Sequence, residues 1–588
     1  MTPATKATQK PLLLRWSEHV PCSDIQDPLG LSLRGASRLA SRLLHCITSI
    51  TPRARYFSFL LWCFHDYQSR EKNRPDALGI RKGVILRENA LTLACAKHHQ
   101  HHKGGTCQGG ALVGTIEAKR WLRRGNTEAD LKTLKFAKIP ALNAYFTSLV
   151  NLGCFVTAGE TTYSDEESEE ARFSWEDIEL SPLGLDLARR YDQVTGALAV
   201  VQGLATGDRR CGVDVLADLG QYGGLCELTC PDAADRPLLR DIFFGLVELP
   251  GDSHPVRRQS LLLILELCRL FGAEQWMLNE GGFASAVYYG ELSNGKERLK
   301  VEMPATLQDI ETRWRMFYFH QYMGVALEGM FSWIVTNLDP HGLGGASVDD
   351  LVARLDDPSS RKDISDLFGT DLPRPFGAMT PREFFDLFGV PRADLGPELG
   401  TAFNLVVSTG HPVAEDTLEG HIRGGAFLQS STGLALPMIL LATTLARYGL
   451  WERTKYGQWL ATAAPDPYLD LVPPVLSAGL SRRFGDWWGR TWRELTEAVL
   501  TRYVVRQHQS MAYEKSASGD RCLLQTDDQK VFATGCYEKI GLGNPRLRSA
   551  IQILKDLALI ETTEDDVTIL TEAGKAFLAQ ELAREVGK

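Results

Sequence analysis

The sequence predicts a mainly α-helical protein that is divided into several domains. Apolar residues recur at the three- and four-residue spacing of helices over most of the chain. Strand patterns are few and short, and they collect at residues 154–180 and 521–536. The chain has 588 residues, and domains of roughly 100–200 residues imply about three to five of them. With 44% hydrophobic and 23% charged residues, the composition is that of an ordinary globular protein rather than a disordered or fibrous one.

The predicted helices follow one another along the chain, and several have recognisable start signals. Residues 35–69 carry a helical pattern, interrupted where Thr51 and Pro52 fit the N-cap and the first position of a second helix. Residues 380–383 (TPRE) form a capping-box pattern with proline at the first helical position. The other helical patterns cover residues 81–102, 110–124, 139–152, 236–248, 255–272, 309–338, 380–389, 396–409 and 435–464.

No segment predicts export or membrane insertion. The first residues lack the apolar core of a secretory signal. The longest nearly apolar stretch, residues 433–446, is shorter than the roughly 20 residues that span a bilayer, so we expect a buried helix there. The 12 cysteines are sparse and lie in apolar surroundings, as reduced buried thiols do. We therefore expect a cytoplasmic protein without membrane contact.

The formal net charge of -9 hides an uneven distribution of charge. Residues 1–140 hold 23 lysines and arginines against 10 carboxylates, whereas residues 141–200 hold 3 against 11. Residues 201–480 are also acidic, with 22 against 36, and residues 481–588 are balanced at 16 against 16. Such an uneven distribution of charge along the chain is typical of a protein whose basic end binds a polyanion while its acidic part is repelled by it.

Two distant segments repeat each other at an offset of 405 positions. Residues 139–155 (IPALNAYFTSLVNLGCF) align with residues 544–560 (NPRLRSAIQILKDLALI), and the prolines and the main apolar positions coincide. In both segments a proline-started amphipathic helix runs into a short strand. The following segments match as well, because residues 178–184 (IELSPLG) and 568–574 (TILTEAG) each precede a further helix. The intervening loop is 15 residues longer in the first copy.

The order helix, strand, loop, strand and a last helix opened by Ser/Thr-x-x-Gly is that of a winged helix. Both copies therefore resemble the winged helix-turn-helix family, many members of which bind DNA. The resemblance implies two modules with short β-hairpin wings that flank a helical middle domain. We expect a basic helical region at 1–108, a winged-helix module with an acidic wing insertion at 109–195, an acidic and mostly helical middle domain at 196–480, and a second winged-helix module at 481–588.

The second copy is the better candidate for DNA binding. A recognition helix presents the side chains of its first turns to base edges or phosphates. The cationic side chains of this helix are Arg546, Arg548 and Lys555. The loop of the first copy contains SDEESEE, residues 164–170, which a phosphate backbone would repel. We expect the first copy to bind protein, or to reach DNA only through the basic run before it.

Two basic surfaces are predicted in the N-terminal part. A run around Trp121 carries seven cations, which phosphates would neutralise with release of counterions. Three arginines further upstream stand four residues apart, where like charges repel unless an anion or a partner relieves them. For each surface a purely solvated face is the alternative. The predicted DNA-binding residues here are Arg34, Arg38, Arg42, Arg53, Arg55, Lys119, Arg120, Arg123, Arg124, Lys132, Lys135 and Lys138.

No metal site, cofactor or catalytic residue is predicted. Cys226 and Cys230 have a metal-compatible spacing, and residues 98–107 (HHQHHKGGTC) hold four histidines and a cysteine. Neither group has a second ligand pair near it in the sequence, so we interpret them as a helix edge and a solvated loop. Phosphate-binding, nucleophile-elbow and zinc-protease motifs do not occur, and no carboxylate and lysine pattern of a nuclease is complete.

The sequence thus predicts a non-enzymatic protein that binds double-stranded DNA through its N-terminal basic region and its C-terminal winged helix. A protein partner would bind the acidic middle. This character is similar to that of prokaryotic proteins of DNA transactions, such as regulators, chromosome organisers and components of antiviral or antiplasmid defence. Two alternatives stay open. The winged helices could serve only protein contacts in an assembly scaffold, or dispersed carboxylates could form a metal-dependent nuclease.

Overall fold

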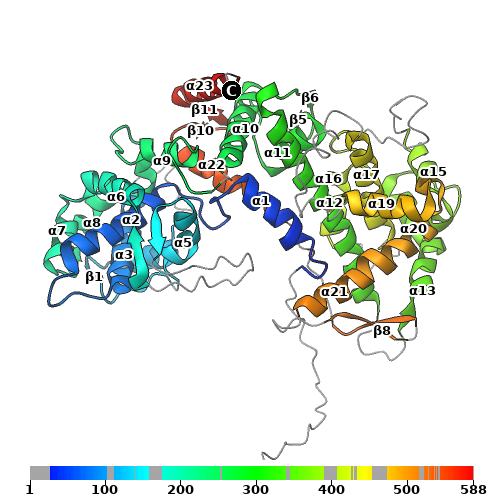
Figure 1. Ribbon diagram of the computed structural model, residues 1–588, viewed down its shortest axis with the longest axis horizontal. Helices are drawn as coiled ribbons and strands as arrows, with labels where there is room; N and C mark the ends of the chain where they lie inside the picture. Colours follow the sequence, from blue (N-terminus) through cyan, green and yellow to red (C-terminus); the bar gives the residue numbers. More distant parts are fainter. Residues whose placement is uncertain are drawn as a thin grey trace, which may run out of the picture. The chain divides into compact units, whose positions relative to one another are not determined.

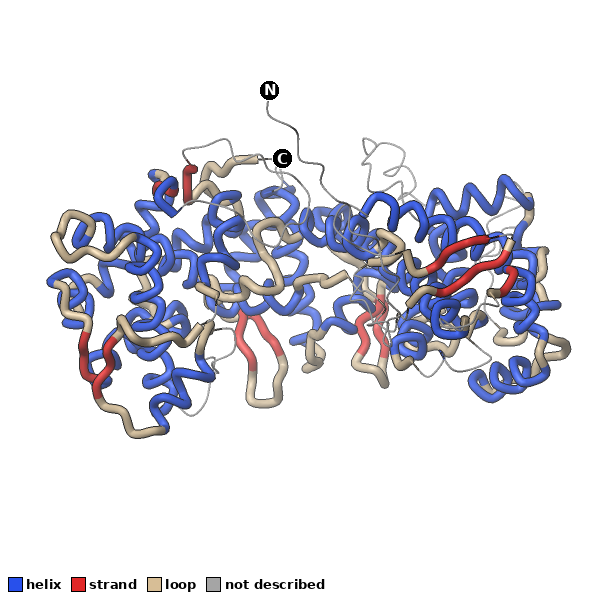
Figure 2. Tube along the Cα trace, turned by 90° about the horizontal axis from the view of Figure 1, so that it is seen from below, coloured by secondary structure: helices blue, strands red, loops and turns tan. Residues whose placement is uncertain are grey.

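Helices make up most of the chain in the computed structural model (Figure 1). The strands form short antiparallel pairs and one three-stranded sheet (Figure 2). The mainly α-helical fold class is therefore confirmed, and no described helix is both long and apolar enough to cross a membrane. The structure describes residues 27–101, 112–137, 139–157, 175–251, 254–338, 345–389, 407–425, 428, 433–452, 473–515, 522–527, 529–535, 537, 540 and 543–586.

The chain divides into two compact units, and each is discontinuous in sequence. The larger unit combines residues 33–320 with 543–588, and the smaller unit combines residues 1–32 with 321–542. Their boundaries fall inside the expected N-terminal region, the expected middle domain and the expected C-terminal module. The division into four consecutive parts stays a prediction.

The larger unit holds both copies of the repeat. Its strands pair two by two, all antiparallel: β1 (Glu128–Asp130) with β4 (Arg210–Gly212), β2 (Phe155–Thr157) with β3 (Ile178–Leu180), β5 (Glu291–Ser293) with β6 (Arg298–Lys300), and β10 (Ile560–Thr562) with β11 (Thr568–Leu570). Its helices are α1 (Arg38–Leu43), α2 (Arg55–Asp66), α3 (Ile80–His101), α4 (Thr115–Arg123), α5 (Ala141–Asn151), α6 (Pro182–Thr195), α7 (Ala199–Thr206), α8 (Val213–Gly223), α9 (Arg236–Phe243), α10 (His254–Ala273), α11 (Glu280–Ala284), the first part of α12 (Gln308–Asn337), α22 (Leu547–Asp556) and α23 (Glu572–Val586). Short 3-10 or π-helical segments are η1 (Ser32–Ser37), which begins in the smaller unit, η2 (Tyr67–Glu71), η3 (Trp175–Asp177), η4 (Leu225–Thr229), η5 (Ser285–Tyr289) and η6 (Ala305–Leu307).

The core around the first copy is built on α2 and α3. Helix α2 packs against α6, and α3 packs against α8. The aromatic residues of α2, among them Phe57, Phe59 and Trp62, are buried, as expected for a core helix. The helix begins later than predicted, with Ala54 as its N-cap. Thr51 instead accepts a hydrogen bond from the backbone N–H of Thr48 at 2.9 Å, which closes the preceding turn.

The two copies of the repeat agree in detail. In the first copy (residues 139–195) β2 pairs with β3 so that Phe155 faces Leu180, and in the second copy (residues 544–586) Ile560 of β10 faces Leu570 of β11. These are equivalent positions of the sequence repeat. The predicted order of helix, strand, strand and helix is therefore present twice, while membership of the winged-helix family stays a prediction.

A buried carboxylate from α3 caps the first helix of the first copy. Glu88 accepts hydrogen bonds from the backbone N–H groups of Ala141 and Leu142 at 3.1 and 3.3 Å. These groups lie in the first turn of α5, where no intrahelical acceptor exists. Burial raises the pKa of the Glu88 carboxyl to about 7, although the two hydrogen bonds oppose the shift. The carboxyl group that caps the start of α5 therefore titrates near neutral pH.

We predict that Glu88→Gln removes a component of the pH dependence of stability. The pKa of Glu88 is about 7 in the folded chain and 4.5 when exposed, so between these values unfolding releases a proton. The free energy of unfolding of the native chain therefore falls by up to about 3 kcal/mol as the pH rises from 4.5 to 7, and then levels off. Urea unfolding of both proteins from pH 5 to 8 measures the difference, and parallel pH profiles would contradict it.

The smaller unit is also helical. Its three-stranded sheet has the order β7 (Ala346–Ser347), β9 (Lys530–Ala533) and β8 (Leu524–Asp527), which confirms the strands expected within 521–536. Its helices are the second part of α12, α13 (Val348–Ala353), α14 (Pro358–Phe368), α15 (Pro381–Asp386), α16 (Glu415–Arg423), α17 (Ala435–Glu452), α19 (Pro473–Phe484), α20 (Trp492–Val499) and α21 (Arg506–Glu514). Short 3-10 or π-helical segments are η7 (Arg354–Asp356), η8 (Phe376–Ala378), η11 (Trp487–Gly489) and η12 (Leu500–Val505).

Two predictions for the smaller unit are confirmed. The side chain of Thr380 and that of Glu383 form the expected capping box at the start of α15. Residues 433–446 are buried and lie in or just before α17. Most of the helix predicted over residues 396–409 lies outside the described residues.

Candidate functional site

Helix α4 presents a basic face to solvent. Thr115, Ala118 and Leu122 are buried at helical spacing and α4 packs against α3, whereas Arg120 and Arg123 are exposed on the other side. Arg124, which caps the helix at its C-terminus, is exposed as well. Lysine and arginine at the end of a helix also interact favourably with its dipole. The predicted basic run therefore does form a charged surface in this part of the chain.

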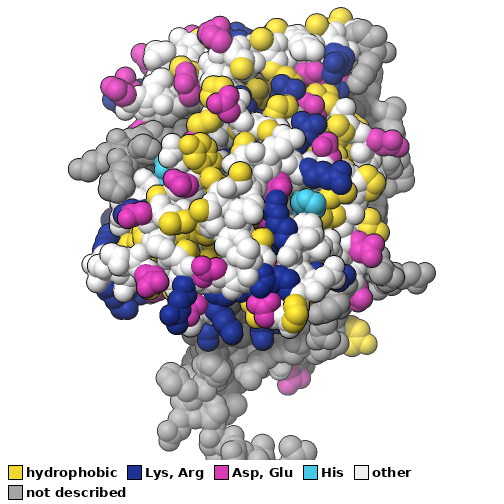
Figure 3. Space-filling model, turned by 90° about the vertical axis from the view of Figure 1, so that its left-hand side faces the viewer, with side chains coloured by type: hydrophobic (Ala, Val, Ile, Leu, Met, Phe, Trp, Pro, Cys, Tyr) yellow, Lys and Arg dark blue, Asp and Glu magenta, His cyan; other side chains and the backbone are white. Residues whose placement is uncertain are grey.

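Further cations follow in the segment after β1. Lys132 and Lys135 are exposed, Lys119 is half-buried, and Lys138 lies outside the described residues. We name the exposed cations of α4 and of the segment after β1 the basic surface: Arg120, Arg123, Arg124, Lys132 and Lys135. Figure 3 shows a face of the molecule with several lysines and arginines near its lower edge, with some carboxylates between them.

Most charges of the basic surface have no ion pair of their own. Arg120 contacts the carboxylate of Glu117 at 2.5 Å, and both side chains are about half exposed, so this pair contributes little stability. For Arg123, Arg124, Lys132 and Lys135 the described part of the chain offers no ion-pairing carboxylate. Exposed cations without partners are the groups that phosphates neutralise at least cost.

Arg53 and Arg55 are buried and ion-paired, whereas the cations of the basic surface are exposed. Arg53 is 4% exposed and its Nε lies 2.9 Å from Asp556 Oδ2, and Arg55 is 1% exposed and contacts Asp235. Burial lowers the pKa of each guanidinium, but the adjacent carboxylate and other neighbouring groups together raise it above its ordinary value, so both stay charged. Both side chains are thus engaged inside the protein, and their expected role in DNA binding stays a prediction.

The first helix of the second copy is packed inside the larger unit. Most residues of α22 are buried, and η4 lies against it. Arg546 donates to Ile47 O at 3.0 Å and to Ser41 Oγ at 2.6 Å, and burial lowers its pKa to about 10. Burial also lowers the pKa of Lys555, which is half-buried. Only Arg548 is well exposed, and its Nε lies 3.1 Å from Glu280 Oε1. Of the three predicted cations of this helix, Arg548 is therefore the exposed one, and the role of the helix in DNA binding stays a prediction.

The remaining predicted residues lie on or near α1 and in the first copy. Arg42 is exposed on α1, Arg38 is half-buried, and the side chain of Arg34 lies outside the described side chains, as do residues 164–170. On α5 the exposed residues are Asn143 and Thr147, which are uncharged. The first copy thus offers no cation on its first helix.

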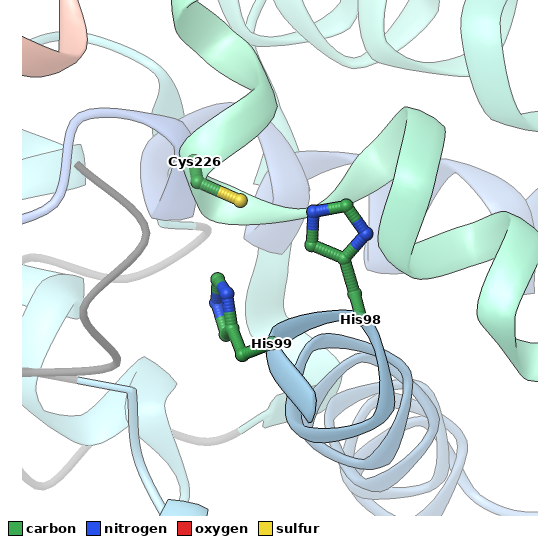
Figure 4. A group of neighbouring side chains, drawn as sticks. All are labelled: His98, His99 and Cys226. Carbon is green, nitrogen blue, oxygen red and sulfur yellow. The ribbon is translucent and has the colours of Figure 1, made fainter. Parts of the chain in front are cut away.

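A cluster of metal-ligating side chains lies elsewhere in the larger unit. His98 and His99 at the end of α3 and Cys226 of η4 place one ligand atom each within 4.8 Å of one another. Figure 4 shows the three side chains converging from these two elements. The histidines and the cysteine are far apart in the sequence, and the fold brings His98 and His99 to Cys226.

A carboxylate completes the surroundings of this cluster. Glu227 Oε1 lies 3.1 Å from His98 Nε2 and 3.5 Å from Cys226 Sγ, and the Cys230 thiol donates to Glu227 Oε2 at 2.8 Å. Burial alone would raise the pKa of Glu227. Hydrogen bonds from His98, Cys230 and Cys226 outweigh burial and lower the pKa to about 2. His98 is buried, whereas His99 is half-buried.

Two chemistries are thus available, a cationic surface for a polyanion and a nitrogen and sulfur cluster for a metal ion. The described cysteines are free thiols, so none of them is committed to a disulfide. No protein family, curated protein or solved structure matches the chain. Its function is therefore inferred from its own residues.

Proposed function

We propose that this protein binds double-stranded DNA through the basic surface of α4 and the segment that follows it. The observation that carries the proposal is the set of exposed cations, four of which have no ion pair within the described residues. Phosphates attract such groups at long range and release counterions on binding. The wider role in prokaryotic DNA transactions, including antiviral defence, stays a prediction.

Binding of this kind is expected to depend little on base sequence. Base-specific readout requires side chains that enter a groove, usually from an exposed helix. Helix α22 is packed inside the larger unit, and α5 exposes only uncharged residues. The exposed cations of the basic surface would contact phosphates, which position a protein on the duplex without reading bases.

Reversing three charges of the basic surface should weaken DNA binding strongly. In the full-length chain with Arg120→Glu, Arg123→Glu and Arg124→Glu, the affinity for a duplex of random sequence should fall by on the order of 10²-fold at low salt. The slope of log K against log salt concentration should become shallower by about 0.9 for each phosphate that the variant no longer neutralises. Fluorescence anisotropy over a series of salt concentrations measures both quantities.

A matched variant distinguishes the effect of the basic surface from the effect of the changed net charge. Lys296, Arg298 and Lys300 are exposed in the β5 and β6 hairpin of the same unit, and reversing them changes the net charge by the same amount. That variant should retain most of the affinity. Equal losses in the two variants, or no change in the first, would overturn the proposal, provided circular dichroism shows both chains folded.

A protein partner is the second candidate, and it applies to the first copy of the repeat. Besides Asn143 and Thr147, two apolar side chains are exposed near its first helix, Ile139 at 64% and Val156 at 52%. An uncharged surface with exposed apolar residues fits protein better than phosphate. If the unaltered full-length chain does not shift duplex DNA even at low salt, the assembly-scaffold interpretation is favoured instead.

A further inference from the structure

We propose that His98, His99 and Cys226 bind a zinc ion, with the carboxylate of Glu227 in the fourth position. This site shares no residue with the basic surface, and it does not depend on DNA binding. All four side chains come from two elements, the end of α3 and the short segment η4. A closed set of four protein ligands is typical of a structural zinc site rather than a catalytic one.

Two distances between ligand atoms are already close to those around a tetrahedral ion. Zinc bonds of about 2.0–2.3 Å place neighbouring ligand atoms about 3.3–3.7 Å apart. Glu227 Oε1 is already 3.1 Å from His98 Nε2 and 3.5 Å from Cys226 Sγ. The ligand atoms of His98, His99 and Cys226 lie within 4.8 Å of one another, a group that does not include Glu227, so side-chain rotations must bring the four groups closer around an ion.

The donor set selects the kind of metal. Imidazole nitrogen and thiolate sulfur bind zinc and other late transition metals, whereas magnesium and calcium require mainly oxygen ligands. Nδ1 of His99 is buried and has no hydrogen-bond partner among the described residues. A buried polar atom without a partner costs free energy, and a metal bond would satisfy it.

The ion would tie together two elements that are distant in sequence. α3 carries α4 on its flank and packs along α8, while η4 follows α8 directly and lies against α22. A bond between the end of α3 and η4 therefore connects the region of the basic surface with the second copy. Because structural zinc contributes its binding free energy to folding, removal of the ion should loosen this connection.

Metal binding by the full-length chain tests the proposal directly. The purified chain is treated with a chelator, dialysed and titrated with Zn²⁺ against a chromophoric competitor, and with Co²⁺ as a spectroscopic probe. We expect one equivalent of either metal per chain, a thiolate-to-cobalt charge-transfer band, and a higher thermal midpoint with Zn²⁺. X-ray absorption of the zinc form should show one sulfur and three nitrogen or oxygen ligands.

Variants assign the ligands. Cys226→Ser and His99→Ala should each weaken zinc binding by more than about 100-fold, and Glu227→Gln by about 10- to 100-fold. Cys268→Ser is the matched control, since Cys268 is a buried thiol of α10 in the same unit, and it should keep full affinity and the cobalt band. The proposal is wrong if the folded wild-type chain takes up no stoichiometric metal, or if the absorption spectrum shows no sulfur ligand. Unchanged affinity in Cys226→Ser would overturn it as well.

Discussion

Replacing Asp556 with alanine should lower the free energy of unfolding by about 3–5 kcal/mol, because it leaves the buried guanidinium of Arg53 without its counter-charge. The carboxylate is fully engaged in the native chain. One oxygen accepts from Arg53 Nε at 2.9 Å and from the backbone N–H of Ala54 at 3.0 Å, and the other accepts from Gln552 at 2.9 Å. The side chains of Arg53 and Asp556 are 5% and 3% exposed, so water cannot replace the missing carboxylate.

A double variant tests whether two apolar side chains can replace the buried ion pair. Arg53→Met should be about as destabilising as Asp556→Ala, whereas Arg53→Met combined with Asp556→Leu should recover much of the loss, since two apolar side chains leave no buried charge. Arg120→Ala is the control, because its exposed pair with Glu117 should be worth less than about 1 kcal/mol. Urea unfolding followed by circular dichroism measures all four variants.

The same variants decide between two interpretations of Arg53. If Arg53 bound phosphate, as its basic surroundings in the sequence suggest, Arg53→Met would leave stability unchanged and weaken DNA binding. If Arg53 instead supports the fold, Arg53→Met lowers the free energy of unfolding. A stable Arg53→Met chain with weakened affinity for DNA would contradict the structural role proposed for the pair.

This pair also shows why sequence reasoning separates surface cations from buried ones poorly. Arg53 and Asp556 are 503 residues apart, and neither position carries a local sign of its partner. The polar positions of an amphipathic helix look the same whether they face solvent or pair with a buried charge. The charge counts do indicate the basic surface near Trp121, because there the local spacing itself leaves several cations on one exposed face.

The repeat could be predicted because it depends on local chemistry. Proline, the apolar spacing and the Ser/Thr-x-x-Gly start of the last helix are all readable within a few residues, and they occur in the same order in both copies. The packing of α22 could not be predicted this way, since it depends on η4 and on residues near Arg53. The metal cluster could not be predicted from the sequence for the same reason. Neither segment has a second set of ligands near it in the sequence, and only the fold brings His98 and His99 to Cys226.

The equivalence of the two copies can be tested at one glycine in each. Gly184 and Gly574 occupy the third position of α6 and α23, where each N–H donates to the capping hydroxyl of Ser181 or Thr571 at 3.0 Å. A Cβ at Gly184 would lie 2.1 Å from the carbonyl oxygen of Cys154, and one at Gly574 would lie 1.9 Å from that of Leu559. Such distances are far below van der Waals contact.

Neither carbonyl can move aside without losing a backbone hydrogen bond. The oxygen of Cys154 accepts from the backbone N–H of Ser181 at 3.0 Å, and that of Leu559 accepts from Thr571 at 3.1 Å. These bonds join the end of the first helix of each copy to the start of its last helix. Displacing the carbonyl would therefore break the link that closes each copy.

Gly184→Ala and Gly574→Ala should each lower the free energy of unfolding by about 3 kcal/mol, the upper part of the range for overpacking in a core. Gly203→Ala is the matched control in the same unit, because α7 leaves room there, with the nearest atom 3.7 Å from the added Cβ. In a helix with room, alanine is favoured over glycine, so this variant should be neutral or more stable by about 0.5–1 kcal/mol. Urea midpoints compare the three. If alanine is tolerated in one copy and not in the other, the two copies do not share the closing contact, and their common sequence pattern reflects helix spacing alone.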